Sequence, residues 1–121
     1  EYAAYQNALT AFRSRNYAEA EKLFGAILKQ FPQGRYADNC HYWIGECNYA
    51  LNDFAKAISA FKLVLTFTSS PKGDDAQIKL GLCYMKMGQN ALAKAEFQKL
   101  LDRYPGSEYS QRAREYLDQI K

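Results

Sequence analysis

The sequence predicts an all-α fold made of stacked helical hairpins. An alanine followed four residues later by a phenylalanine recurs three times, at intervals of 37 and then 36 residues: Ala20 and Phe24, Ala57 and Phe61, Ala93 and Phe97. No segment of strand length alternates apolar with polar residues. A period of this length, divided into two helix-length halves, indicates a stack, because a single hairpin cannot bury its own apolar face.

Length and composition are those of one soluble globular domain. The chain has 121 residues, of which 48% are hydrophobic and 24% charged, and no apolar run approaches the roughly 20 residues of a membrane span. The net charge of +3 comes from scattered lysines and arginines, which argues against a nucleic-acid footprint. No signal peptide is present and the chain begins inside a predicted helix, as expected of a mature protein or an excised domain.

The first repeat begins with a helix over residues 2–14. Its apolar side chains recur at helical spacing: Tyr5, Ala8, Leu9 and Phe12. Asn16 is suited to cap the second helix, because its side chain can accept a bond from a free backbone N–H group. Phe31 and Pro32 close the repeat, since proline cannot continue a helix.

The second and third repeats follow the same plan. Asp53 caps the second helix of repeat two, and Gln89 or Asn90 caps that of repeat three after Gly88 ends the preceding helix. A gapless alignment puts Tyr104-Pro105 in the place of Phe31-Pro32 in repeat three, and Thr68-Ser69 there in repeat two. Gly45 and Gly81 fall in register with Ala8. Because glycine inside a helix costs about 1 kcal/mol relative to alanine, the register predicts close helix contact there.

The last segment, residues 107–121, aligns with the start of a fourth repeat. Tyr116 falls on Trp43 and Leu117 on Ile44, while the opposite face is polar. A half-repeat that packs on one side and is solvated on the other is how such stacks end. We therefore expect one domain over residues 1–121, with repeats at about 1–34, 37–71 and 73–106 and a capping helix over 107–120.

The cysteines and acidic residues indicate no catalytic or metal site. Cys40 and Cys47 would lie roughly 10 Å apart along one helix, too far for a disulfide, and we expect them and Cys83 to be small buried side chains. The single histidine, His41, has no set of zinc ligands around it. Asp74-Asp75 suit the first turn of a helix. With no phosphate loop and no nucleophile beside a base, we expect a non-enzyme that needs no cofactor and no metal.

Several positions resemble the tetratricopeptide repeat (TPR) family. The small and aromatic positions of that repeat match Ala8, Ala20, Phe24 and Pro32, and the residues beyond its usual length fall in the turn at 33–35. The resemblance implies a TPR superhelix of three helix-turn-helix repeats plus a C-terminal capping helix.

Two stretches, 36–46 (YADNCHYWIGE) and 72–81 (KGDDAQIKLG), resemble the C-terminal TPR domain of the YbgF/CpoB family of Tol-Pal-associated periplasmic proteins. The chain departs from that pattern at three places: Cys40 replaces alanine, Asn48 an aromatic residue, and Thr68-Ser69 a Tyr-Pro pair.

The resemblance implies a non-catalytic periplasmic adaptor of the Tol-Pal system. Its partner would be TolA, and its role would be to coordinate outer-membrane constriction with peptidoglycan synthesis at cell division. The family's trimerising coiled coil is not in this chain, so oligomerisation would depend on that segment. A second interpretation is a BamD-like subunit for outer-membrane protein assembly, which a lipid-attachment cysteine upstream would favour and an upstream heptad region would oppose.

In TPR stacks the first helix of each repeat lines a concave groove, and the resemblance carries this over to residues of this chain. The expected partner-binding residues are Tyr2, Tyr5, Leu9, Phe12, Arg13, Asn39, Tyr42, Glu46, Tyr49, Ile78, Leu82, Met85 and Lys86. Such an aromatic groove suits a protein or peptide segment with apolar side chains. For any one of these positions, packing between helices is an equal alternative. We expect Trp43 in the core and an ion pair between Lys79 and Asp75. A clamp for a C-terminal carboxylate, from Arg13, Asn39 and Lys86, is a weaker alternative.

Overall fold

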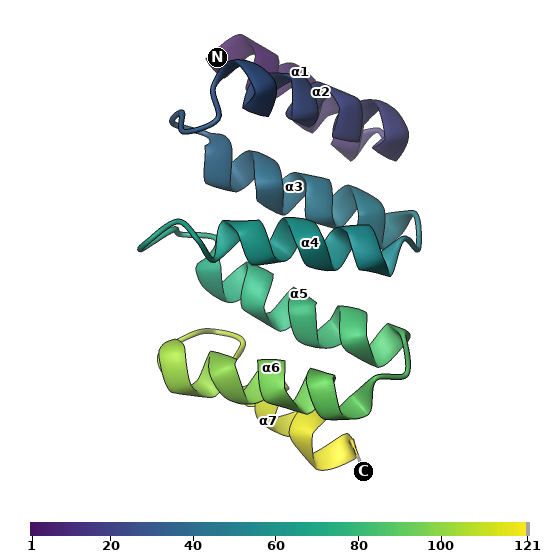
Figure 1. Cartoon of the computed structure of the whole chain (residues 1–121), viewed down its shortest axis with the longest axis vertical. Coiled ribbons are helices and arrows are strands. Elements are labelled where there is room, and N and C mark those ends of the chain that lie inside the picture. Colours follow the sequence, from purple (N-terminus) through teal and green to yellow (C-terminus); the bar gives the residue numbers. More distant parts are fainter. Residues whose placement is uncertain (121) are drawn as a thin grey trace.

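A computed structural model describes residues 1–120, which form seven helices and no strand. The helices are α1 (Tyr2–Arg13), α2 (Tyr17–Gln30), α3 (Ala37–Ala50), α4 (Phe54–Val64), α5 (Gly73–Lys86), α6 (Asn90–Arg103) and α7 (Ser110–Gln119). They stack in chain order along the long axis of the molecule (Figure 1). The predicted all-α stack is confirmed. None of the described helices is long and apolar enough to cross a membrane.

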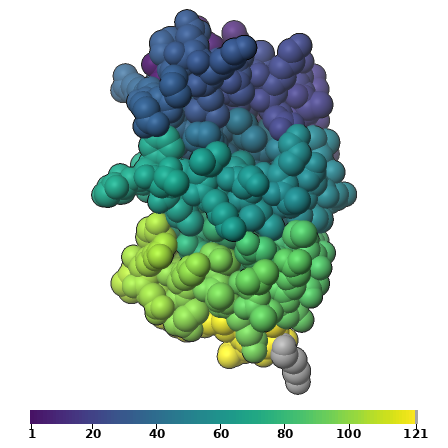
Figure 2. All heavy atoms as spheres, in the orientation of Figure 1, coloured from purple at the N-terminus to yellow at the C-terminus, as the bar shows by residue number. Residues whose placement is uncertain are grey.

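The stack has two walls. Each helix packs against the next along the chain, from α1 on α2 to α6 on α7. In Figure 1 α1 lies behind α2 and α7 behind α6, so the even-numbered helices face the viewer there and in Figure 2. Side chains also join successive odd-numbered helices. Trp43 Nε1 of α3 donates to the Tyr5 hydroxyl of α1 at 2.9 Å, Lys79 of α5 lies 3.2 Å from Glu46 of α3, and the hydroxyl of Tyr109, the N-cap of α7, donates to Asp75 of α5 at 2.6 Å. The odd-numbered helices therefore form a continuous inner wall.

The recurrent phenylalanines are the centre of each hairpin. Phe24, Phe61 and Phe97 are 0% exposed, as are the three alanines that precede them. A Cβ atom at Gly45 would lie 2.5 Å from Phe61 Cε1, and one at Gly81 would lie 2.4 Å from Phe97 Cε1. The two glycines therefore let the first helix approach the ring of the second. This confirms the close contact that the register predicts.

The predicted N-cap residues lie at the expected positions, but most of them do not make the expected side-chain hydrogen bond. Asn16, Asp53 and Gln89 all stand at N-cap positions, but only Asp53 accepts a side-chain bond, from the Lys56 N–H group at 3.2 Å. Gly88 follows α5 with a φ of +72°, a left-handed conformation that glycine adopts without steric cost. Gly88 thus follows the end of α5, as predicted, and Arg15 and Asn52 adopt the same conformation at the equivalent positions after α1 and α3.

The end of α4 differs from the gapless alignment. After Val64 the chain tightens into successive i→i−3 bonds, from Leu65 to Lys62 and from Phe67 to Val64. Phe67 then accepts a bond from Ser70, in the way that Phe31 accepts one from Gly34. Phe67, and not Thr68, therefore occupies the position of Phe31. The prediction that placed Thr68-Ser69 there is wrong by one residue, because the tighter turn shortens repeat two.

An acidic residue near the start of each first helix bonds to the turn that begins the next repeat. Ser70 Oγ donates to Asp38 at 2.5 Å, and Ser107 Oγ donates to Asp74 at 2.6 Å. At the equivalent place in repeat one, Glu1 accepts a bond from the backbone N–H of Tyr36 at 3.4 Å. Asp74 and Asp75 lie in the first turn of α5, as predicted, and they also bond to the following repeat.

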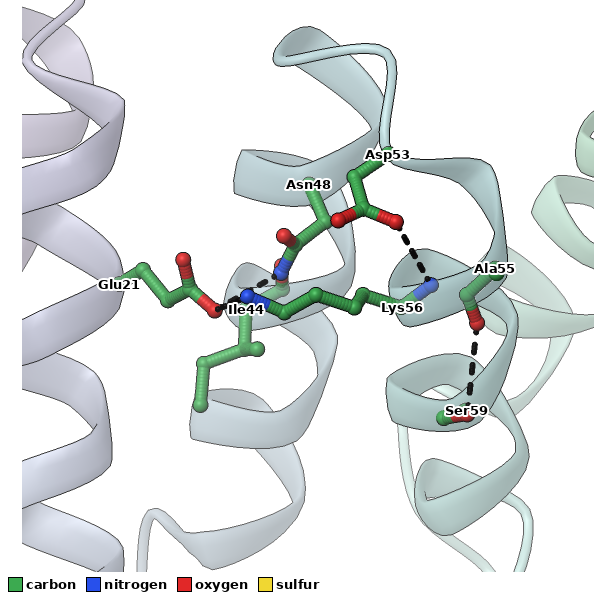
Figure 3. Close-up of polar contacts among 7 residues, drawn as sticks. All are labelled: Glu21, Ile44, Asn48, Asp53, Ala55, Lys56 and Ser59. Carbon is green, nitrogen blue, oxygen red and sulfur yellow. Dashed lines mark hydrogen bonds and ion pairs between the residues drawn. The ribbon is translucent and has the colours of Figure 1, made fainter.

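A polar cluster joins repeats one and two on the side of the even-numbered helices. Asn48 on α3 is 1% exposed and donates to Glu21 of α2 at 3.1 Å, while Lys56 Nζ of α4 lies 3.2 Å from the same carboxylate oxygen (Figure 3). Asn48 also donates to the Ile44 carbonyl at 2.9 Å. These bonds explain why a polar residue replaces the aromatic one that the family prefers at position 48. One repeat later, the equivalent positions hold apolar residues: Ile58, Tyr84 and Leu92.

The three cysteines are buried and free, which confirms that they serve as small core side chains. Burial raises the pKa of each thiol to about 12. They therefore stay protonated at neutral pH and are poor nucleophiles.

Replacing Gly81 with alanine tests the close contact of the hairpin helices. We expect Gly81→Ala to lower the free energy of unfolding by roughly 1 to 2 kcal/mol, because the clash with Phe97 outweighs the gain in helix propensity. Gly25→Ala is the matched control, since its Cβ would meet nothing within 4 Å, and we expect it to stabilise the protein by up to about 1 kcal/mol. Urea unfolding measures both. Equal effects of the two changes would contradict the packing described here.

Removing single members of the polar cluster tests its energetics. We expect Asn48→Ala to cost about 1 to 3 kcal/mol, because the partly buried Glu21 carboxylate loses a hydrogen-bond donor and a buried side chain is truncated. Lys56→Ala should cost less than about 1 kcal/mol, since the Lys56 side chain is 58% exposed. Chemical denaturation of both variants gives the order, and a larger loss for Lys56→Ala would refute this account.

Candidate functional site

The inner wall consists of three contacts between successive odd-numbered helices, which we call steps. At each step two residues near the end of one helix meet one residue of the next odd-numbered helix. Step one is Leu9 and Phe12 with Trp43, step two is Glu46 and Tyr49 with Lys79, and step three is Leu82 and Met85 with Tyr116. These residues occupy equivalent positions in the repeat, so the three steps are the same backbone with different side chains.

Step one is closed by aromatic packing. The rings of Phe12 and Trp43 lie 4.9 Å apart between centres, and Tyr36 stacks on Tyr5 at 4.5 Å with an angle of 11° between the planes. Leu9 beside them is only 7% exposed. Aromatic and aliphatic side chains therefore fill this end of the inner wall.

Step two is closed by an ion pair. Lys79 Nζ lies 3.2 Å from Glu46 and 4.3 Å from the centre of the Tyr49 ring, and the two charged side chains are only 24% and 17% exposed. Burial raises the pKa of the Glu46 carboxyl, and the Lys79 charge opposes this rise without cancelling it. Nearby, Lys72 Nζ covers the Tyr42 ring at 4.9 Å. Lysine stems and ammonium groups thus cover the rings at the middle of the wall.

The sequence predicted an ion pair between Lys79 and Asp75, and this prediction is wrong. Lys79 pairs instead with Glu46 on the neighbouring odd-numbered helix. The Asp75 carboxylate is instead bonded to the hydroxyl of Tyr109 at 2.6 Å. Lys79 therefore pairs with a carboxylate on another helix and not with the one that lies one turn away on its own helix.

Step three is open. A cleft of about 420 Å³ lies between α3, α5 and α7 and is lined by Tyr49, Leu82, Met85, Lys86 and Tyr116. The Tyr116 ring stacks on Phe97 of α6, with 4.9 Å between centres and 20° between planes. That stacking holds the ring against α6 and leaves space in front of Met85. Four of the five lining residues are among the predicted partner-binding residues.

The remaining predicted site residues lie elsewhere. Tyr5, Leu9, Tyr42 and Ile78 are between 3% and 7% exposed and belong to the core clusters, so their assignment to an open groove is corrected. They are buried because aromatic and lysine side chains of the following repeat lie over the inner wall. The others stay outside the cleft: Tyr2, Phe12, Arg13, Asn39 and Glu46.

Sequence reasoning missed Tyr116 as a site residue. Tyr116 aligns with Trp43, which was expected in the core. The capping helix was expected only to pack against the end of the stack. Trp43 does pack between the two core clusters, half-buried, as predicted. Within residues 1–120 no later helix packs over the same position in α7, which was the available sign that Tyr116 would line a surface.

A smaller cleft of about 230 Å³ lies between α1 and α2, lined in part by Ala4 and Leu23. The residues equivalent to Ala4 fill this space in the other repeats. His41 packs on Phe67 with 5.9 Å between ring centres, and Gln77 donates to Glu96 at 2.8 Å. The small cleft is therefore explained by a short side chain at position 4.

Comparisons with known proteins agree with this architecture. A family model described as "YfiO: Outer membrane lipoprotein" matches residues 1–121. The cell division coordinator CpoB of Pseudomonas putida is 35% identical over 49 residues, which is 40% of this chain and 18% of that protein. The chain thus matches less than a fifth of that relative's length.

Solved structures share the fold at low sequence identity. The secretion chaperone SycD of Yersinia enterocolitica, in complex with a peptide of the translocator YopD, has a TM-score of 0.84 and 20% identity, covering 98% of this chain and 89% of that one. The first TPR of Spaghetti (RPAP3), bound to the HSP90 peptide SRMEEVD, has a TM-score of 0.80 and 19% identity, covering 98% and 87%. The TPR fold is confirmed.

The burial of Glu46 makes stability depend on pH in a defined direction. Its raised pKa means that the folded protein holds this proton more tightly than the unfolded chain, so raising the pH above the ordinary value of 4.5 reduces stability. We expect wild type to lose stability relative to Glu46→Gln between pH 4 and pH 7, because glutamine stays neutral. Urea unfolding at several pH values measures the difference.

Lys79→Met provides the control for that experiment. The ammonium group is the largest of the interactions that oppose the burial of the Glu46 carboxylate, so without it the loss of stability with rising pH should be steeper than in wild type. The difference in unfolding free energy between wild type and Glu46→Gln could instead stay constant, or favour wild type increasingly, as the pH rises. Either result would show that the ion pair outweighs the desolvation of Glu46.

Proposed function

The chain belongs to the YfiO family of outer membrane lipoproteins, and we propose that it is a non-catalytic protein-binding domain of the bacterial cell envelope. The observation that carries the proposal is the open cleft at step three, where apolar side chains of three helices remain uncovered. Two structures of the same fold hold peptides, from the translocator YopD in one and from HSP90 in the other. A partner segment seated in the cleft is the function that this arrangement supports best.

The energetic basis is the burial of apolar surface. Fully burying one large apolar side chain contributes about 1.5 to 3 kcal/mol, and a few such anchors dominate the affinity of a typical interface. Leu82, Met85 and Tyr49 offer such surface on helices that the core holds rigid. A rigid site loses little entropy on binding, which favours affinity.

The proposed partner is TolA, and the proposed setting is the periplasm. Both rest on the resemblance to CpoB, whose name describes a cell division coordinator. In that role the domain would help to coordinate outer-membrane constriction with peptidoglycan synthesis. The cleft would supply the contact with TolA, and segments outside this chain would supply the rest of the protein's activity.

A second candidate is a subunit for outer-membrane protein assembly, of the BamD type. The observation in its favour is that the YfiO family model spans the whole chain, whereas the CpoB match covers 49 residues. The two candidates share the binding cleft and differ in the partner. They are separated by which purified partner binds to the cleft.

Calorimetric titration of the domain with purified TolA tests the first candidate. We expect Met85→Glu to weaken binding by about tenfold or more, because it places an unpaired charge in the apolar cleft. Leu63→Glu on the exposed face of α4 is the matched control and should leave the affinity unchanged. Absence of TolA binding would reject this partner. Equal weakening by both variants would reject the cleft.

A further inference from the structure

We propose that the step-three cleft selects one large aromatic side chain of the partner, and that an acidic group of the partner next to that side chain pairs with Lys86. This inference rests on the proposed function and specifies the chemistry of the segment that the cleft receives. It is carried by a comparison of the three steps, which share a backbone and differ in what fills them.

Step one shows what a filled step contains. There the rings of Phe12 and Trp43 pack at 4.9 Å between centres, and Trp43 also lies parallel to Phe24 within 15°. At step three Met85 replaces Phe12, and Tyr116 keeps its stacking on Phe97 within 20°. The ring that the end of α1 supplies in step one has no counterpart at the end of α5. An aromatic side chain from outside would restore the packing found in step one.

The walls of the cleft suit a ring more than an aliphatic chain. Tyr49 of α3 and Tyr116 of α7 flank the α5 residues Leu82 and Met85. Aromatic pairs gain from edge-to-face and offset packing beyond the area they bury, and methionine sulfur makes favourable contacts with ring edges. A branched aliphatic side chain would bury area in the same place and gain neither contact.

Charge at the rim favours an acidic neighbour for that ring. Lys86 lines the cleft, is exposed, and has no ion-pair partner among residues 1–120. Lys79 at the neighbouring step two is already paired with Glu46. The one unpaired cation lining the cleft would therefore meet a carboxylate of the partner, next to the docked ring.

The test uses three capped dipeptides as probes: acetyl-Trp-Glu-amide, acetyl-Leu-Glu-amide and acetyl-Trp-Lys-amide. Each is titrated into the ¹⁵N-labelled domain, and dissociation constants are read from amide shifts in α5 and α7. We expect Trp-Glu to bind about fivefold tighter than either of the others. Binding of the leucine probe with equal affinity, no binding of Trp-Glu, or no dependence on the acidic residue would each overturn the proposal.

Variants at equivalent positions locate the effect. Lys86→Glu should reverse the preference between Trp-Glu and Trp-Lys, whereas Arg13→Glu makes the same charge change at the equivalent position of closed step one and should leave it intact. Met85→Trp should fill the cleft and abolish binding of Trp-Glu. Leu82→Phe provides a second filling variant if Met85→Trp does not fold. Unaltered binding in a folded filling variant, or an equal effect of Arg13→Glu, would contradict the assignment.

The probes also separate this inference from the proposed function. Selective Trp-Glu binding together with failure of TolA to bind would support the cleft chemistry and reject the proposed partner. TolA binding that depends on Met85, together with equal leucine and tryptophan binding, would keep the function and reject aromatic selectivity.

Discussion

The rest of the structure depends on one contact in each hairpin. The buried phenylalanine of the second helix packs against a position on the first helix that has no room for a larger side chain. Gly45 lies against Phe61 and Gly81 against Phe97 so closely that an added Cβ would overlap the ring. This spacing fixes each hairpin, and the hairpins in turn bring side chains of successive odd-numbered helices into contact in the inner wall. Because that wall is set by the core, the residues on its surface can vary without changing its shape.

The inner wall shows what such variation achieves. Equivalent positions carry aromatic packing at step one, a half-buried ion pair at step two and an open cleft at step three. Within residues 1–120 side chains thus close steps one and two of the inner wall and leave step three open. An uncovered apolar site on a rigid frame is the usual starting point for recognition of another polypeptide.

Much of the fold could be predicted from the sequence, since the alanine and phenylalanine pattern, the glycine register and the breaks at Pro32 and Gly88 are all local signals. Four residues that line the cleft are among the thirteen that the TPR resemblance assigns to partner binding, and their role in binding stays a prediction. Two features of the structure could not be predicted. The shortening of α4 depends on backbone bonding after Val64, which a gapless alignment cannot show. The burial of Tyr5 and Tyr42 depends on Tyr36 and Lys72 reaching over them from the next repeat. Periodicity identifies a face of a helix, but not what another segment places on it.

The polar cluster of Glu21, Asn48 and Lys56 gives the modules of this protein a fixed order. In a stack of identical repeats, one repeat could be deleted and its neighbours joined without loss of contacts. Here, loss of residues 38–73 would bring α2 against α5 and α6, where Tyr84 and Leu92 occupy the places of Asn48 and Lys56. The partly exposed Glu21 carboxylate would then lose both the amide of Asn48 and the ammonium group of Lys56. Unequal recombination between such similar repeats would therefore yield a chain that lacks the polar contacts joining its first two repeats.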